Sequence, residues 1–232
     1  ESLLASVGLH IPKDVIQTRI NRNVVHLPGG KEVEIPTHAL AVFRGFAPVR
    51  PAVETIGQIR GFDAWLLNEA KNAGAEVVES PVTKIQVGRD KTVVYAGGEA
   101  TNVHLVVGAF GHKRGDLEID TGGELFDESE TQPASVREYY LEDTRAREKL
   151  RESMHVFGNP TRKIWYAAVI PKGKYATIVM MGRDGADQSY FREFLALPAV
   201  KDLLGDLTGQ RSNCACINDI TVRSPNKIST EN

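Results

Sequence analysis

The sequence IRGFDAWLLNEAKNAGAEV, residues 59–77, decides the fold of this chain. Its apolar residues recur at the spacing of one helix face: Phe62, Trp65, Leu66, Ala70 and Ala73. Asp63 lies in the first turn, where the helix dipole favours an anion, and Gly74 is a typical helix stop. The stretch therefore predicts a helix over residues 62–73 and a short strand over residues 76–78.

The residues around this helix indicate further strands. Downstream we expect strands over residues 82–87 and 92–95, a turn at Gly97-Gly98, and a strand over residues 103–109. The last of these contains the apolar run LVVGAFG, residues 105–111, which is typical of a strand buried on both faces. Upstream, the glycines at 29 and 30 separate two alternating segments and predict a β-hairpin within residues 15–46.

The second half of the chain has the pattern of an antiparallel sheet with helices. Strands are expected over residues 136–142, 155–158, 163–171, 175–182 and 214–222, and helices over residues 144–153, 189–197 and 198–204. The acidic stretch 116–132 has weak periodicity, so a domain change is expected there. The fold class is thus mixed, α/β over residues 1–115, with the hairpin inserted, and α+β over residues 116–232.

Composition excludes several classes of protein. Apolar residues make up 41% of the 232 residues, charged residues 25%, and the net charge is −2, so nothing favours binding to nucleic acid. No apolar run is long enough to cross a membrane. Cys214 and Cys216 are two residues apart on one strand, which indicates reduced thiols in a cytoplasmic protein, and no metal-ligand spacing is visible.

Three segments, taken in order, resemble flavin-dependent oxidoreductases of the geranylgeranyl reductase and FixC-like family. The first is the helix that starts at Arg60-Gly61-Phe62-Asp63 and leaves through Gly74-Ala75-Glu76-Val77. The second is Val106-Val107-Gly108-Ala109-Phe110-Gly111, which is similar to a V-V-G-A-D-G segment near the flavin of many relatives. The third is the aromatic strand from Trp165, which ends at Pro171 and turns at Gly173. The Cys214-Ala215-Cys216 strand is also similar to FixC-type relatives.

This resemblance implies a partial FAD-binding, Rossmann-like portion followed by a substrate domain. The parent enzyme would bind FAD, accept electrons from NAD(P)H or another donor, and reduce C=C bonds of an isoprenoid, geranylgeranyl-type substrate. The expected partner is a hydrophobic small molecule, and the family is compatible with peripheral contact with a membrane. The sequence contains no G-x-G-x-x-G loop, so the chain is expected to be a central fragment that lacks its pyrophosphate-binding end.

The resemblance assigns site residues to two groups. Arg60, Gly108 and Gly111 are expected near the cofactor, although Arg60 is equally explained as a surface residue paired with Asp63 and the glycines as strand ends. Trp165, Tyr166, Pro171 and Gly173 are expected to contact the substrate, with ordinary packing as the alternative, and no catalytic residue is identified. The histidines at 26, 38 and 155 show no spacing of a ligand set or catalytic triad.

The chain also departs from the family pattern. Phe110 stands where many relatives have aspartate, and the tryptophan of the Y-x-W-x-F-P pattern has moved to Trp165, on the other side of the strand. These departures leave other functions open. One is electron transfer to a quinone or flavin-dependent hydroxylation on the same scaffold, and another is a non-catalytic module that does not bind FAD alone.

Overall fold

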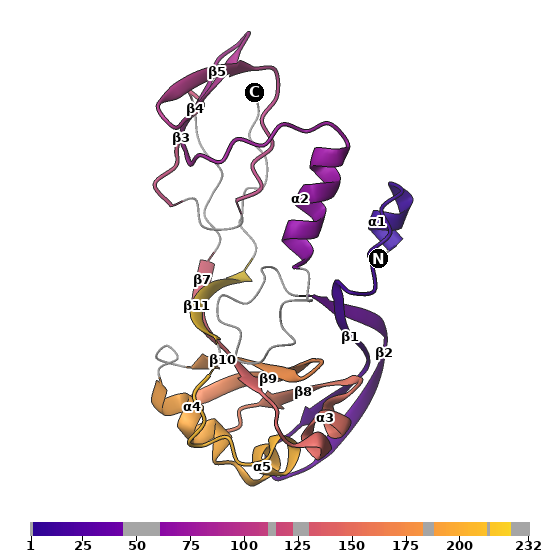
Figure 1. Ribbon diagram of the computed structural model, residues 1–232. Helices are drawn as coiled ribbons and strands as arrows, with labels where there is room; N and C mark the ends of the chain where they lie inside the picture. The colour runs from indigo at the N-terminus through magenta and orange to yellow at the C-terminus, as the bar shows by residue number, and fades with distance from the viewer. Residues whose placement is uncertain are drawn as a thin grey trace. The chain divides into compact units, whose positions relative to one another are not determined.

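The computed structural model describes residues 2–43, 61–110, 115–122, 130–182, 188–212 and 214–223, drawn in colour in Figure 1. Arg60 and Gly111, two of the expected cofactor residues, lie outside these ranges. The chain folds as two compact units, one formed by residues 1–74 and 133–219 and the other by residues 75–132 and 220–232. The division expected at residues 115–116 concerns domains of a parent enzyme and stays a prediction.

The first unit is built on a seven-stranded sheet with the order β11-β7-β10-β9-β8-β1-β2. Its strands are β1 (Ile16–His26), β2 (Glu32–Phe43), β7 (Glu130–Tyr140), β8 (Ser153–Gly158), β9 (Ile164–Lys172), β10 (Tyr175–Gly182) and β11 (Cys214–Arg223). The pairs β1–β2, β8–β9, β9–β10 and β7–β10 are antiparallel, as the sequence predicts for its second half. By contrast, β1 pairs with β8 in parallel, which joins the hairpin to strands more than a hundred residues downstream.

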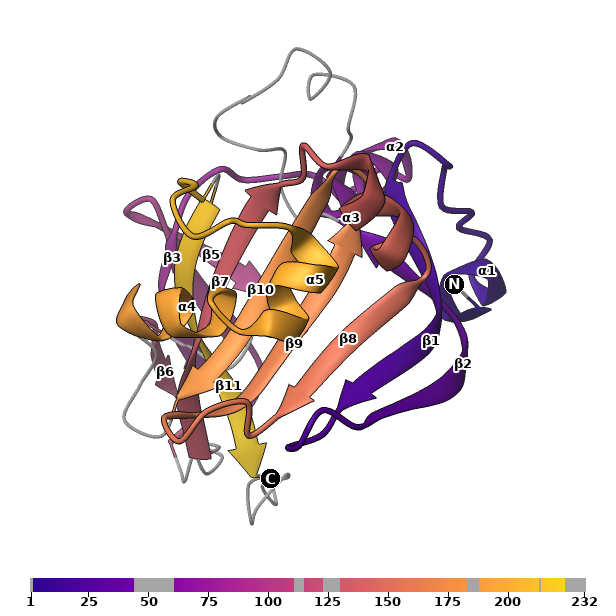
Figure 2. The ribbon, with the colours of Figure 1, turned by 90° about the horizontal axis from the view of Figure 1, so that it is seen from below.

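Three helices cover one face of this sheet: α3 (Thr144–Leu150), α4 (Gln188–Leu195) and α5 (Pro198–Leu204) (Figure 2). Asp143 caps α3, because its Oδ1 accepts a hydrogen bond of 2.8 Å from the backbone N–H of Arg145. The core between helices and sheet is apolar, and its fully buried members include Ile178, Phe194 and Leu204. We refer to the covered side as the helix face and to the other side as the open face.

The hairpin and the helix over residues 62–73 form as the sequence predicts. Gly29 and Gly30 take positive φ angles of 89° and 82° in the turn between β1 and β2, a conformation that glycine adopts without steric strain. Helix α2 (Phe62–Asn72) is preceded by Gly61 and followed by Gly74 at a φ of 95°. Of its expected apolar face only Trp65 is buried, in a chain of ring contacts through Phe62 to the end of β2. A short helix, α1 (Ser2–Ser6), precedes β1.

The second unit carries a four-stranded sheet with the order β5-β4-β3-β6. Its strands are β3 (Val82–Val87), β4 (Thr92–Ala96), β5 (Glu99–Val103) and β6 (Glu118–Asp120). β3 runs antiparallel to β4 and parallel to β6, and Lys84 reaches Glu118 across the parallel pair at 2.7 Å. Both units together give the mixed α/β and α+β class that the sequence predicts.

Two strand predictions in this unit are wrong. Residues 76–78 form no strand, and the strand expected over residues 103–109 does not form either, because the strand in this region, β5, covers Glu99–Val103. Leu105 and Val107 are 79% and 80% exposed. The run is apolar enough to be a buried strand, but no other described strand pairs with it, so its backbone and side chains stay in contact with water.

Candidate functional site

The open face of the seven-stranded sheet carries mostly apolar side chains, several of which are buried, such as Ala168 and Met181, together with a buried hydroxyl on Thr177. The register places Thr177 of β10 between Ile170 of β9 and Glu138 of β7, all on this face. Thr177 is only 6% exposed, and its Oγ1 atom has no hydrogen-bond partner in the described structure. Because a buried hydroxyl without a partner costs free energy, this atom is a candidate for contact with a ligand.

A buried ion pair borders the same position. Glu138, 6% exposed, lies 4.0 Å from the Nζ of Lys172, whose side chain is 19% exposed. The open face thus combines apolar side chains, an unpartnered hydroxyl and one pair of opposite charges. Such a surface is suited to orient a largely apolar small molecule.

The structure separates the four residues expected to contact substrate. Tyr166 is half-buried on the open face, and burial raises the pKa of its hydroxyl. Trp165 lies at an irregularity in β9, where Tyr166 pairs with Met181 and Ile164 with Gly182, so that Trp165 itself has no partner in β10. The two rings are 6.3 Å apart. Trp165 and Tyr166 therefore lie side by side in β9, and their contact with a substrate stays a prediction.

Pro171 and Gly173 lie elsewhere, at a cavity of about 330 Å³. The other residues that line it are Thr18, Thr144, Arg147, Glu148 and Arg151. Arg147 donates from its Nε to the Leu141 carbonyl at 2.6 Å and from a terminal nitrogen to the Glu142 carbonyl at 3.3 Å. Because its donors hold backbone carbonyls at the start of α3, this arginine acts as a brace for the loop between β7 and α3.

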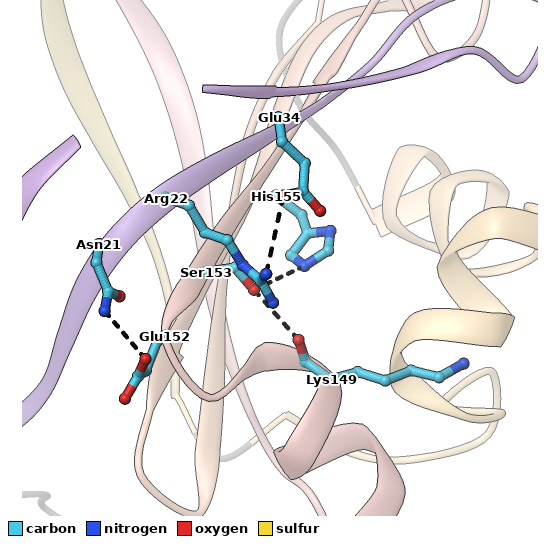
Figure 3. A network of polar contacts seen from close by, with 7 residues as sticks. All are labelled: Asn21, Arg22, Glu34, Lys149, Glu152, Ser153 and His155. Carbon is cyan, nitrogen blue, oxygen red and sulfur yellow. Dashed lines mark hydrogen bonds and ion pairs between the residues drawn. The ribbon is translucent and has the colours of Figure 1, made fainter. Parts of the chain in front are cut away.

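A histidine network is the feature that sequence reasoning missed. The parallel register of β1 and β8 brings His26 next to His155, and the Nε2 of His26 lies 2.9 Å from the Nδ1 of His155. The Nε2 of His155 is 3.1 Å from the Oγ of Ser153, which is 3.2 Å from the Lys149 carbonyl (Figure 3). At the other end, Glu32 lies 3.1 Å from the Nδ1 of His26. The sequence shows no local signal for this contact, because it depends on a pairing across 129 residues.

The number of protons on the two imidazole rings decides which hydrogen bonds of the network can form. Glu32 and the Lys149 carbonyl only accept hydrogen bonds, so His26 must donate to the first and Ser153 to the second. His155 must then donate to Ser153, and one further proton is needed between the two rings. The network therefore needs three ring protons, whereas two neutral histidines carry two. One added proton completes every contact, and in the neutral state one contact has no proton.

Burial opposes this added proton. His155 is 8% exposed, and burial, followed by the nearby His26 and Arg22, lowers its pKa to about 4. Burial also lowers the pKa of His26, against the attraction of Glu32. Near neutral pH both rings are uncharged, and the network carries one contact without a proton. It is a chain of groups that takes up a proton only in acid.

Of the three expected cofactor residues, the structure describes only Gly108. A Cβ atom added at Gly108 would meet the ring of Phe110 at 2.7 Å, so this ring lies against the glycine. The sequence has no glycine loop that opens a helix with its N–H groups aimed at a pyrophosphate. The expected role of Gly108 near a flavin therefore stays a prediction.

Comparisons with known proteins identify the fold. No family model and no curated protein sequence matches the chain. Among solved structures, a geranylgeranyl bacteriochlorophyll reductase-like protein from Thermoplasma acidophilum has a TM-score of 0.61 at 14% identity, over 99% of this chain and 57% of that protein. A flavoprotein/dehydrogenase from Cytophaga hutchinsonii has a TM-score of 0.53 at 14% identity, over 94% of this chain and 52% of its own.

A third similar structure is HpxO from Klebsiella pneumoniae, solved with FAD and uric acid. Its TM-score is 0.51 at 14% identity, over 95% of this chain and 56% of HpxO. This chain thus spans just over half the length of each of the three proteins and shares the fold of the matching part. Among the described helices, none is long and apolar enough to cross a membrane.

Proposed function

We propose that this chain is part of a flavin-dependent oxidoreductase that binds FAD in its intact form. The observation that carries the proposal is the likeness in fold to a reductase-like protein over 99% of the chain, together with FAD in the structure of HpxO. In this proposal the substrate is an isoprenoid whose C=C bond is reduced by hydride transfer from reduced FAD, with NAD(P)H or another donor supplying the electrons.

The open face of the first unit supports a hydrophobic substrate. Tyr166 and Ile170 give it apolar surface, and the Oγ1 of Thr177 gives it one unpartnered polar atom. Hydride transfer to an apolar double bond needs a site that excludes water and holds the substrate in place. The proposed roles of Trp165 and Tyr166 are to form a wall of this site, and those of Arg60, Gly108 and Gly111 are to lie near the cofactor.

The second unit supports the proposal that further segments complete the cofactor site. Leu105 and Val107 are apolar and exposed, as residues of an inner strand would be without the strands beside it. In this proposal, the FAD pyrophosphate is bound by a glycine loop in the intact enzyme, next to a strand that pairs with this run. The cofactor would then reach the second unit only when those segments are present.

An assay of the intact protein tests the reaction. Reduced enzyme is mixed without oxygen with an isoprenoid alkene or with a quinone, and separately with an aromatic acid together with dioxygen, which hydroxylation consumes. Reoxidation of the flavin is followed with product analysis. We expect the isoprenoid to reoxidise the flavin fastest and to yield its saturated product. Faster turnover with the quinone or a hydroxylated aromatic product would contradict the assignment of substrate while leaving the flavoprotein assignment in place.

One observation favours a rival function, a non-catalytic interaction module. The ring of Phe110 lies against Gly108, in the segment expected near the flavin. Titration of the intact protein with FAD, followed by flavin fluorescence, separates the two functions. Quenching that saturates at one FAD per chain supports the oxidoreductase, and unchanged fluorescence supports the interaction module.

A further inference from the structure

A second cavity, of about 270 Å³, opens on the helix face of the first unit, away from the open face discussed above. Its lining includes three arginines from three separate elements: Arg137 on β7, Arg192 on α4, and Arg211 after α5. The remaining lining residues are Tyr139, Phe191, Leu195, Thr208, Gly209 and Gln210. The lining has no carboxylate, although the chain as a whole carries a net charge of −2.

Arg137 occupies an unusual place for a cation. Its register partner in β10 is Ile178, which is fully buried, so its side chain starts on the core side of the sheet. Its guanidinium carbon lies 4.2 Å from the centroid of the Phe191 ring, and Phe191 is 1% exposed. This contact places the guanidinium over the aromatic ring, and no side-chain hydrogen bond to a described residue uses its N–H groups.

No anionic side chain within the described residues neutralises this group. Glu138, the adjacent residue, points to the open face and lies near Lys172. Asp206, the carboxylate nearest in sequence to the loop, accepts hydrogen bonds from Thr208 and lies 3.4 Å from Lys201. Partial burial of the Arg137 cation carries a desolvation cost, which an anionic ligand at the cavity would offset. Arg192 and Arg211 line the same cavity, so three arginines share it.

The cavity is held in shape by its own loop. The side-chain amide of Gln210 donates to the Tyr140 carbonyl at 2.8 Å, and its backbone N–H donates to the Leu207 carbonyl at 3.0 Å. These bonds fix the segment that carries Arg211 against the end of β7. At the first cavity, by contrast, Arg147 donates its side-chain hydrogen bonds to backbone carbonyls. The three arginines here make no hydrogen bond or ion pair with any described residue through their side chains.

We propose that this cavity binds the phosphate group of a small soluble molecule. Arginine forks match the oxygens of phosphate, and three of them supply more donors than a single carboxylate accepts. The volume suits a phosphate with a few further atoms, which would lie against Tyr139 and Leu195. The proposal concerns the helix face of the first unit and does not depend on the flavin.

Isothermal titration calorimetry with the full chain tests this site. Inorganic phosphate, glycerol phosphate and acetate are titrated at equal ionic strength, with sodium chloride as the blank. We expect one site per chain for both phosphates and at least about tenfold weaker binding of acetate. Equal affinity for acetate and phosphate, or heats no greater than those of chloride, would overturn the proposal.

Variants locate the binding. Arg137→Gln should weaken phosphate at least about tenfold, as expected for loss of a charged hydrogen-bond donor. Because Arg137 is partly buried, the double variant of the exposed Arg192→Gln and Arg211→Gln provides a second test that leaves the core untouched, and it should weaken phosphate by a similar factor. The matched control is Arg145→Gln, an exposed arginine on α3, which should bind like the parent chain. Unchanged affinity in the double variant would contradict the site.

Sedimentation with phospholipid vesicles shows whether the site binds a soluble phosphate or the phosphate of a lipid headgroup. The chain is sedimented with phosphatidylcholine vesicles that contain phosphatidic acid. We expect no cosedimentation beyond that of pure phosphatidylcholine vesicles. Cosedimentation that the double variant abolishes, without calorimetric binding of soluble phosphate, would replace the proposal with a membrane contact.

Discussion

Similar apolar runs of sequence are buried in the first unit and exposed to solvent in the second. In the first unit, the run in β9 packs beneath helices, and Ala167 and Val169 are fully buried. In the second unit, the run at residues 105–107 leaves Leu105 and Val107 about four-fifths exposed. The difference lies in the neighbours: the first run has a strand on each side and helices above it, and the second has no described strand beside it. An apolar run becomes a buried strand only where partner strands are available.

This contrast predicts that the same substitution, leucine to alanine, lowers stability strongly in the first unit and hardly at all in the second. It is the largest effect that we expect. Leu204 is 1% exposed in the core of the first unit, and Leu105 is 79% exposed in the second. Leu204→Ala should lower the free energy of unfolding by about 2–5 kcal/mol, because it removes buried atoms and leaves a cavity. Leu105→Ala should change it by less than about 0.5 kcal/mol. Urea denaturation of both variants measures this, and a comparable loss for Leu105→Ala would show that the run is buried after all.

The histidine network extends the contrast to polar groups, because the first unit buries them in its sheet. The pKa of His155 is about 4 in the folded protein, against an ordinary value of 6.5. Between pH 4 and pH 6.5 the unfolded chain therefore binds a proton at His155 more readily than the folded chain does. The stability that comes from neutral His155 is present above pH 6.5 and is lost as the pH falls toward 4. The total change is roughly 3 kcal/mol.

Measuring the free energy of unfolding from pH 7 to pH 4 checks this expectation. His155→Gln should flatten the slope over that range, and the exposed His38→Gln should leave it as it is. An equally steep slope in His155→Gln would mean that another group is responsible for the acid sensitivity.

A smaller effect is expected at the start of α3. Asp143 caps this helix, and Asp143→Ala should cost about 1 kcal/mol of stability. Asp143→Asn should retain most of it, because the asparagine oxygen accepts the same hydrogen bond. Thermal unfolding of the two variants distinguishes the cap from the charge, and equal losses in both would assign the effect to the carboxylate.

The smallest effect is expected in the second unit, where the Lys84–Glu118 pair joins β3 to β6 on the surface. The hydrogen bond to Glu118 raises the pKa of Lys84, but this lysine is too exposed for the pair to hold the sheet together. Lys84→Gln should shift the unfolding midpoint only slightly, and 0.5 M salt should remove the difference, roughly as screening predicts. A shift as large as that of Leu204→Ala would contradict this picture of the unit.

Local patterns in the sequence predict much of the fold. The hairpin glycines, the helix between Gly61 and Gly74, and the β9–β10 turn at Gly173 each depend on neighbours in the chain, and all three are confirmed. The strand expected over residues 103–109 is wrong because burial needs partners that a local pattern does not reveal. The meeting of His26 with His155 escaped prediction for the same reason, since it follows from a parallel pairing of distant strands.

The candidate site is less predictable than the fold. Tyr166 lies on the open face as a strand pattern allows, but Pro171 and Gly173 line a cavity at the edge of α3. Only the structure identifies Thr177 as a candidate, because no sequence pattern predicts that a buried hydroxyl has no hydrogen-bond partner. The roles of these residues in binding stay predictions, as do those of Arg60 and Gly111 outside the described ranges.

The most direct test of the flavoenzyme proposal is the visible absorption spectrum of the intact protein, purified from its natural source. The proposal predicts a yellow protein whose cofactor, released by denaturation, is FAD at one molecule per chain, and whose colour bleaches on reduction. A colourless intact protein that gains no flavin absorption after incubation with FAD would contradict it.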